Sequence, residues 1–250
     1  MANTVNDAEI LNRRIFVVDV LEKVEEVKLF IDGKEIKSQS QVLLDSFNPA
    51  TGRVIAKVPT ATYEELQEAI SVASEAFKTW KETPSVERAR IFMRYQALLR
   101  EHLEELAEGL SIEQGKVLED ARGDIIRGIE VVEQAANIPT YLMGETVENV
   151  ARGVDSVSYL QPLGICAGIT PFNFPAMIPL WMFPLAIAAG NTFILKPSEQ
   201  APQTAIRLAK LLKEAGLPDG VLNIVHGCED VVNYLCEHPE IKAISFVGSA

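Results

Sequence analysis

Cysteine and histidine are scarce in this sequence of 250 residues, with three of each. The cysteines, Cys166, Cys228 and Cys236, are odd in number and lack paired spacing, which argues against a disulfide framework and fits a reducing compartment. Their places in a predicted strand, a turn and a helix favour ordinary buried or half-buried thiols. No CxxC or HxxxH spacing joins these residues, so we expect no bound metal.

Positive charge is also in short supply: 23 lysines and arginines against 35 acidic residues give a formal net charge of −12. Such a chain is a poor partner for nucleic acid or an anionic membrane surface. The apolar run at 15–18 is too short for a signal or transit peptide, so we expect a cytoplasmic protein. The longest charge-free stretch, 156–195, carries five prolines, which favour a buried strand and helix over a membrane span.

Hydrophobic residues make up 48% of the chain, enough for a substantial core. We expect a loosely attached leader at 1–27 and then a block at 28–144 that contains β-ribbon and helices. In this block, Asp32-Gly33 predicts the turn of a surface hairpin, and residues 46–52 predict a turn followed by a strand. Three amphipathic helices follow, with their charges on solvated faces. They are predicted behind the Thr62-x-x-Glu65 capping box, at 85–112 and at 116–138.

The hydrophobic pattern of the second half of the chain changes at 145 and again at 162. Residues 145–161 form two short alternating runs about Gly153, which predict a protruding hairpin. From 162 to 250 apolar strands alternate with helices, a pattern typical of a parallel sheet with helices on both faces. The sequence therefore predicts an α/β fold.

Polar residues follow three of the predicted strands, at 170–175, 196–199 and 248–249, where ligands bind in doubly wound sheets. Asn173 lies in an uncharged turn bounded by prolines, where an amide is costly to bury without a partner. Such a donor could stabilise an oxyanion formed by attack on a carbonyl. The alternative is an asparagine that bonds only the backbone of its own turn.

Lys196 and Glu199 have the chemistry to hydrogen-bond the hydroxyls of a nucleotide ribose, and the carboxylate would favour NAD over NADP. The alternative is that Ser198 or Glu199 caps the following helix. Gly248-Ser249 could let backbone approach a diphosphate, or Ser249 could be a plain helix cap. No GxGxxG motif follows a strand, so NAD would have to bind by another arrangement.

Several motifs occur together and in order: ITPFNFP, MIPLWMFPLAIAAGNT, KPSEQ, AGLPDGVLNIVHG and ISFVGS. From 48 to 250 the chain thereby resembles the aldehyde dehydrogenase family. Phe172 and the segment GICAGITPFNFPAMIPLWMFP are similar to its CoA-acylating methylmalonate-semialdehyde dehydrogenase branch. The resemblance implies a Rossmann-like NAD-binding part at 162–250 and an oligomerisation hairpin at 145–161, with intact members forming homo-oligomers.

The resemblance also implies roles for individual residues. Asn173 would be the amide of the oxyanion hole, and Arg127 would bind the substrate carboxylate, although a solvated or salt-bridged helix arginine is the alternative from the residues alone. The NAD-binding residues would be Lys196 and Glu199 at the adenosine ribose, Thr170, Phe172 and Gln200 along the cleft, Gly227 near adenine and Ser249 at the diphosphate.

Intact members of this branch would oxidise malonate or methylmalonate semialdehyde: a cysteine attacks the aldehyde, hydride passes to NAD, and the acyl group is released onto CoA. In the family, the nucleophilic cysteine lies beyond the FVGS strand, and none of the three cysteines here matches it. We therefore expect the catalytic domain to be absent and no turnover by this chain alone. The alternatives are a non-catalytic nucleotide-binding or assembly module and an inactive truncated product.

Overall fold

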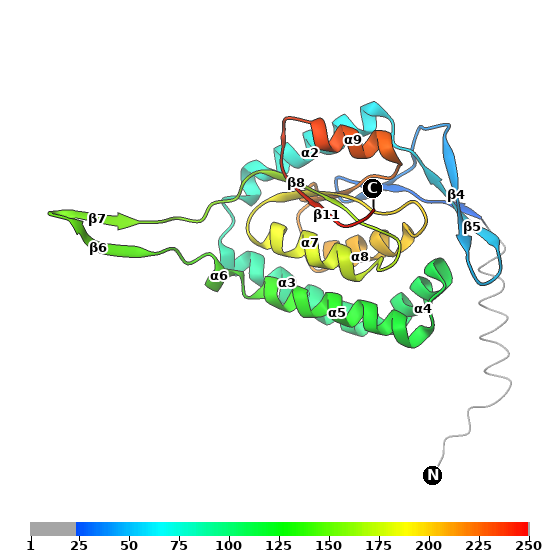
Figure 1. Ribbon diagram of the computed structural model, residues 1–250, viewed down its shortest axis with the longest axis horizontal. Helices are drawn as coiled ribbons and strands as arrows, with labels where there is room; N and C mark the ends of the chain where they lie inside the picture. Colours follow the sequence, from blue (N-terminus) through cyan, green and yellow to red (C-terminus); the bar gives the residue numbers. More distant parts are fainter. Residues whose placement is uncertain (1–23, 250) are drawn as a thin grey trace, which may run out of the picture.

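The computed structural model describes residues 24–249 and arranges them around a six-stranded sheet of order β11-β8-β9-β10-β2-β3 (Figure 1). The leader predicted at 1–27 lies largely outside the described residues. Strands β11, β8, β9 and β10 are parallel, and β2 and β3 extend the sheet as antiparallel strands. The α/β prediction is thus confirmed. The strands are β2 (Leu29–Ile31), β3 (Lys34–Ile36), β8 (Ile165–Ile169), β9 (Thr192–Lys196), β10 (Leu222–Ile224) and β11 (Ile241–Phe246).

The central strands end together at one edge of the sheet. Every residue of β8, β9 and β10 is buried, because helices cover both faces, and this explains why most of their residues are apolar. Ile169 pairs with Lys196, and Leu195 pairs with Ile224, so the three strands finish side by side. A Cβ at Gly168 would lie 2.7 Å from the ring of Phe193, so glycine is required for this packing. The loops that carry the predicted site residues therefore leave from neighbouring points.

Helices cover both faces of the sheet (Figure 1). Helices α2 (Tyr63–Trp80) and α9 (Glu229–Glu237) lie on one face, over a core that includes Ile194. Helices α7 (Met177–Ala188) and α8 (Gln203–Glu214) lie on the other. The predicted capping box of α2 is confirmed: Glu65 N–H donates to Thr62 Oγ1 at 3.3 Å, and Thr62 N–H donates to Glu65 Oε2 at 2.8 Å.

A further helical layer packs outside α7 and α8. The helix predicted at 85–112 is two helices, α3 (Ser85–Glu101) and α4 (Leu103–Gln114), which meet at a bend at His102. The apolar spacing continues across the bend, which is why the sequence does not reveal it. The predicted third helix is α5 (Leu118–Ala136), followed by the single turn α6 (Ile138–Tyr141).

The N-terminal ribbons differ from prediction in two ways. Asp32 and Gly33 do turn the β2–β3 hairpin, with φ of 53° and 67°. The surface position was wrong for β2, which is fully buried against β10, whereas β3 lies at the sheet edge and is mostly exposed. The turn predicted from residue 46 starts only after Asn48, because β4 continues to pair with β5 until that residue. A second sheet has the order β1-β5-β4, from β1 (Glu25–Glu26), β4 (Leu43–Asn48) and β5 (Arg53–Pro59).

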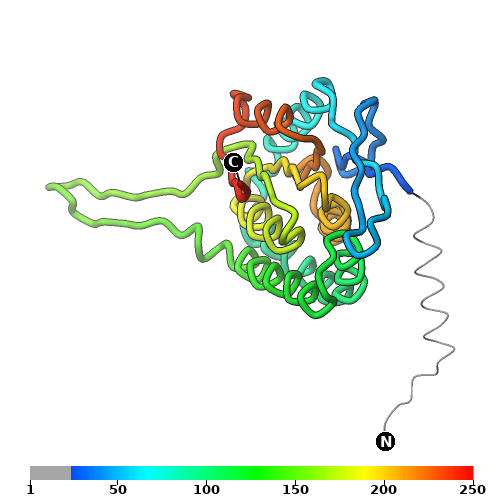
Figure 2. The backbone as a smooth tube through the Cα atoms, turned by 45° about the vertical axis from the view of Figure 1, so that its right-hand side comes forward, coloured from blue at the N-terminus to red at the C-terminus, as the bar shows by residue number. Residues whose placement is uncertain are grey.

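The hairpin predicted at 145–161 is confirmed as β6 (Thr146–Ala151) and β7 (Val154–Val157). All residues of both strands are exposed, and the hairpin extends away from the body of the protein (Figures 1 and 2). Among the helices of the described part of the chain, none is long and apolar enough to cross a membrane.

Candidate active site

Lys196 and Glu199 form a polar pair where β9 ends. Lys196 Nζ lies 3.4 Å from Glu199 Oε2, and the lysine side chain is 6% exposed, against 30% for the glutamate. The alternative role, capping of α8, was wrong for both Ser198 and Glu199, because the first N–H groups of α8 donate instead to Glu113. Glu199 is therefore not bound by α8, and it can meet a ligand together with Lys196, the buried cation that pairs with it.

The ends of β8 and β10 add an unpaired hydroxyl and an unpaired imidazole nitrogen. Thr170 follows β8, and its buried Oγ1 has no hydrogen-bond partner within residues 24–249. His226 follows β10 and is fully buried, with its Nε2 3.1 Å from the carbonyl of Lys28 and its Nδ1 unpaired in the same described region. Burial and, to a smaller extent, the nearby Lys196 lower the pKa of His226 to about 4, so the ring is neutral at pH 7.

Gly227 shapes the backbone next to these groups. Its φ is +148°, and a Cβ at this position would lie 2.4 Å from Cγ2 of Val231, the first buried residue of α9. A side chain is excluded on both grounds. Chain and ligand can therefore approach closely at this point.

Asn173 lies on the loop between β8 and α7 and is exposed. Its backbone carbonyl accepts a hydrogen bond from Lys116 Nζ at 2.9 Å. Within the described residues its side-chain amide forms no hydrogen bond, so the alternative of an asparagine bonded to its own turn was wrong. The amide is available to a ligand.

Ser249 and Arg127 are the remaining predicted residues. Ser249 is exposed, three residues beyond the end of β11. Arg127 is exposed on α5, and its guanidinium forms no ion pair in the part of the chain that the structure describes. Its backbone carbonyl accepts from Trp181 Nε1 at 3.3 Å, which fixes α5 against α7.

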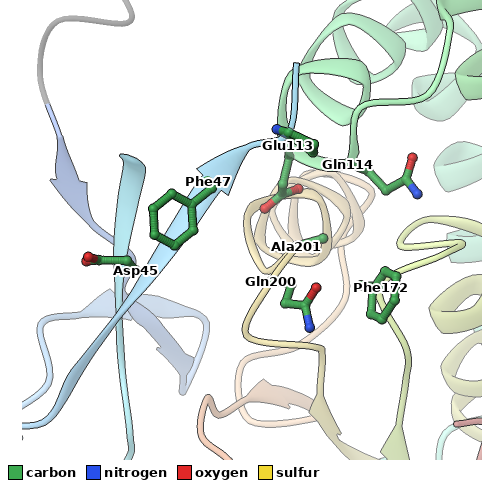
Figure 3. Close-up of a pocket in the computed structure, with 8 residues that line it drawn as sticks. Asp45, Phe47, Glu113, Gln114, Phe172, Gln200 and Ala201 are labelled. Atoms are coloured by element: carbon green, nitrogen blue, oxygen red, sulfur yellow. The ribbon is translucent and has the colours of Figure 1, made fainter. Parts of the chain in front are cut away.

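Phe172 and Gln200 line the same pocket, which has a volume of about 490 Å³ (Figure 3). It lies between the loops that follow β8 and β9, the strand β4 and the end of α4. The other predicted site residues do not line it. Its walls are Asp45, Phe47, Pro49, Glu113, Gln114, Phe172, Gln200 and Ala201.

Three residues that hold these loops were missed by the sequence analysis, which placed the helix charges on solvated faces. Glu113 is buried at the end of α4 and accepts from Thr204 N at 3.0 Å and from Thr204 Oγ1 at 2.7 Å. Asp124 is fully buried in α5, and Lys116 bonds it from the α4–α5 connection. A signal was present, because Glu113 and Asp124 both fall on the apolar stripe of their helices.

The cysteines also differ in part from prediction. Cys166 is buried in β8, as expected, and burial raises the pKa of its thiol. Cys228 and Cys236 are exposed, so the prediction of buried or half-buried thiols was wrong for them. Cys228 lies in the loop that precedes α9, and Cys236 lies on the outer side of that helix. No group of three or more potential metal ligands occurs among residues 24–249.

A largely parallel sheet that is covered by helices on both faces and carries polar loops at its carboxyl edge defines a doubly wound α/β protein. Residues 36–250 match the model of the aldehyde dehydrogenase family. The chain belongs to the aldehyde dehydrogenase family.

The relatives are semialdehyde dehydrogenases. Malonate-semialdehyde dehydrogenase 2 of Geobacillus kaustophilus is 58% identical over 226 residues, covering 90% of this chain and 47% of that protein. The mitochondrial, acylating methylmalonate-semialdehyde/malonate-semialdehyde dehydrogenase of Rattus norvegicus is 51% identical over 226 residues, covering 90% of this chain and 42% of that protein. The chain thus spans about half the length of the curated relatives it matches.

Solved structures agree. Methylmalonate-semialdehyde dehydrogenase from Oceanimonas doudoroffii superimposes with a TM-score of 0.88 at 46% identity, covering 90% of this chain and 46% of that one. A Sinorhizobium meliloti protein, described as a methylmalonate-semialdehyde dehydrogenase complexed with NAD, gives 0.89 at 49% identity, covering 91% and 46%.

Proposed function

We propose that this chain is the NAD-binding portion of a CoA-acylating (methyl)malonate-semialdehyde dehydrogenase. The observation that supports this most is the Lys196–Glu199 pair at the end of β9, flanked by the unpaired hydroxyl of Thr170 after β8 and by Gly227 after β10. The names of the relatives supply the substrate class. The division into 28–144, 145–161 and 162–250 belongs to the same proposal, as does a cytoplasmic location, which the three free cysteines suit.

The residues at this edge fit an adenine dinucleotide. Lys196 Nζ can donate to one ribose hydroxyl while Glu199 accepts from it or its neighbour, and the carboxylate repels a 2′-phosphate. Thr170 Oγ1 offers a hydrogen bond that no protein group in the described region takes. Phe172 and Gln200 would line the cleft, with Gly227 near adenine and Ser249 at the diphosphate. Bound NAD would supply a hydride acceptor.

Two further side chains would act on the substrate. The free amide of Asn173 would donate to the aldehyde oxygen as negative charge develops on it, and a preorganised donor of this kind is worth about 10²–10³ in rate. Arg127, which is exposed and unpaired within residues 24–249, would bind the carboxylate of the semialdehyde through its planar fork. CoA would be the acyl acceptor in the intact enzyme.

The chain alone should not turn over. Cys166 is buried, and the pKa of Cys228, an exposed residue, is raised by partial desolvation of its thiol and by the charge of Glu199, so neither thiol is activated. When NAD and malonate semialdehyde are added to the purified chain, we expect no NADH absorbance at 340 nm above a no-protein control. Formation of NADH at an enzyme-like rate would contradict this part of the proposal.

Nucleotide binding is tested separately by calorimetric titration of NAD into the wild-type chain and into Glu199→Ala. We expect the variant to bind about ten- to a hundredfold more weakly, because it loses a hydrogen bond to a charged group. Glu82→Ala, on the exposed surface beyond α2, is the matched control and should bind like the wild type. Absence of heat with the wild-type chain would sink the NAD assignment.

A second candidate function, assembly, is favoured by the exposed valines on the β6–β7 hairpin. Val147, Val150, Val154 and Val157 are each about half exposed, at 49–58%. Apolar side chains on a protruding ribbon suit contact with another copy of the chain. Sedimentation velocity should show an oligomer for the wild type and a monomer after Val150→Lys and Val154→Lys are combined. A monomeric wild type would exclude the assembly role.

A further inference from the structure

We propose that Lys116 and Asp124 are positioning residues that fix the loop carrying Asn173 at its middle and at the end where α7 begins. This inference rests on the proposed function for its importance, but the contacts that carry it are independent of NAD. The loop runs from Thr170 to Ala176, between β8 and α7.

Asp124 holds the end of the loop at which α7 begins. The side chain is fully buried in α5, and its Oδ1 accepts from the backbone N–H of Met177, the first residue of α7, at 2.7 Å. The residue before α7 is Ala176, which offers no side chain for capping. A carboxylate from another helix therefore satisfies the N-terminus of α7 and complements its dipole.

Lys116 holds the middle of the loop. Its Nζ bonds Asp124 Oδ2 at 2.7 Å and donates to the carbonyl of Asn173 at 2.9 Å. The same ammonium lies 4.4 Å from the centroid of the Phe174 ring. One cation thus contacts two consecutive loop residues and the carboxylate that caps α7.

The α4–α5 connection presents Lys116 rigidly. It begins at Gly115, whose φ is +88°, and Ser111 Oγ donates to the carbonyl of Lys116 at 2.8 Å. The backbone N–H of Lys116 donates to Gln114 Oε1 at 3.1 Å. With both backbone groups fixed and the side chain only 12% exposed, the ammonium has little freedom.

The contacts of Lys116 and Asp124 fix the direction of the Asn173 side chain as well as the packing of the loop. The backbone around Asn173 is otherwise irregular, and its exposed amide can point in one direction only if the peptide that carries it is fixed. A preorganised donor needs such support from residues around it, which these two residues supply. Removing the cation should free the loop while leaving the sheet below it intact.

Hydrogen–deuterium exchange of the whole chain tests this in Lys116→Met, Lys116→Arg and Lys78→Met. The methionine keeps the length of the lysine side chain, the arginine keeps its charge, and Lys78 is an exposed lysine of α2 that serves as the matched control. In Lys116→Met we expect exchange at 172–177 to rise about ten- to a hundredfold, as for loss of a hydrogen bond to a charged group, with β8 and β9 unchanged. Lys116→Arg should restore part of the protection, and Lys78→Met should match the wild type.

A second readout follows the Asn173 side chain itself. The side-chain NH₂ signal of Asn173 in ¹⁵N–¹H spectra should shift in Lys116→Met and return toward its original position in Lys116→Arg. Unchanged exchange and an unmoved signal would overturn the inference. Exchange that rises equally in β8 and β9 would also overturn it, because the role would then be structural. Titration of NAD into the wild-type chain tests the proposed function separately from the positioning role of Lys116 and Asp124. If the wild-type chain does not bind NAD, the NAD assignment is wrong, and the positioning role is still decided by the exchange and NMR results.

Discussion

Glu113→Gln is the substitution that most sharply tests how the loop after β9 is held. The Glu113 carboxylate accepts from Thr204 N at 3.0 Å, from Thr204 Oγ1 at 2.7 Å and from Gln203 N at 2.5 Å. A glutamine keeps the shape but turns one acceptor into a donor that faces N–H groups. One buried N–H is left unpaired, at a cost of about 1–3 kcal/mol.

Loss of the charge itself should add little to this cost. Burial raises the pKa of Glu113 despite its hydrogen bonds. The cost of desolvating the charged carboxylate is therefore larger than the stabilisation that these hydrogen bonds provide to it. We therefore expect a decrease of about 2 kcal/mol in the free energy of unfolding at pH 7, measured by urea denaturation. Glu108→Gln, one turn earlier and exposed, is the control and should stay within about 0.5 kcal/mol of the wild type.

The pH dependence has a definite sign. Because the folded-state pKa of Glu113 is raised, the folded protein holds this proton more tightly, and the stability it contributes is lost as pH rises from about 4.5 through the folded value. The difference in unfolding free energy between wild type and Glu113→Gln should therefore be larger at pH 5 than at pH 7. A difference no greater than that of Glu108→Gln, or one that shrinks on acidification, would refute this reasoning.

Three further outcomes are expected. His226 should stay neutral in NMR titrations down to about pH 4. Because its pKa in the folded state lies below the unfolded value of 6.5, the unfolding free energy of the wild type should fall by about 3 kcal/mol between pH 6.5 and pH 4. His226→Gln should not show this loss of stability. Arg88→Met should destabilise by about 2–4 kcal/mol in thermal unfolding, because the buried guanidinium donates to the carbonyl of Ala188 at 2.7 Å, where α7 ends. The purified chain with NAD and malonate semialdehyde should give no NADH absorbance at 340 nm above a no-protein control.

Most of the fold could be predicted because its signals are local. The alternation of apolar strands and helices after 162 gave the parallel sheet, and the Thr62–Glu65 capping box marked the start of α2 correctly. The bend at His102 could not be found, because apolar spacing runs through it. The burial of β2 was also hidden, because its partner β10 lies nearly 200 residues away in the sequence.

The positions of the candidate site residues were easier to predict than the residues that hold the site loops in place. The places of Lys196 and Thr170 at the ends of strands could be predicted, because polar residues directly after apolar runs stand out in sequence. Glu113, Lys116 and Asp124 were overlooked because acidic and basic residues on helices usually face solvent. Their partners lie on α7, α8 and the loops before them, and only the folded chain brings these together.

The central claim is that Lys196 and Glu199 hold a nucleotide ribose, and the ratio of NAD to NADP affinity measures it most directly. In calorimetric titrations the wild-type chain should bind NAD at least about tenfold more tightly than NADP, because the Glu199 carboxylate repels a 2′-phosphate. Glu199→Gln, which keeps the shape and removes the charge, should reduce the ratio of NAD to NADP affinity, mainly by increasing the affinity for NADP. Equal affinities in the wild type, or a ratio that Glu199→Gln leaves unchanged, would contradict the account.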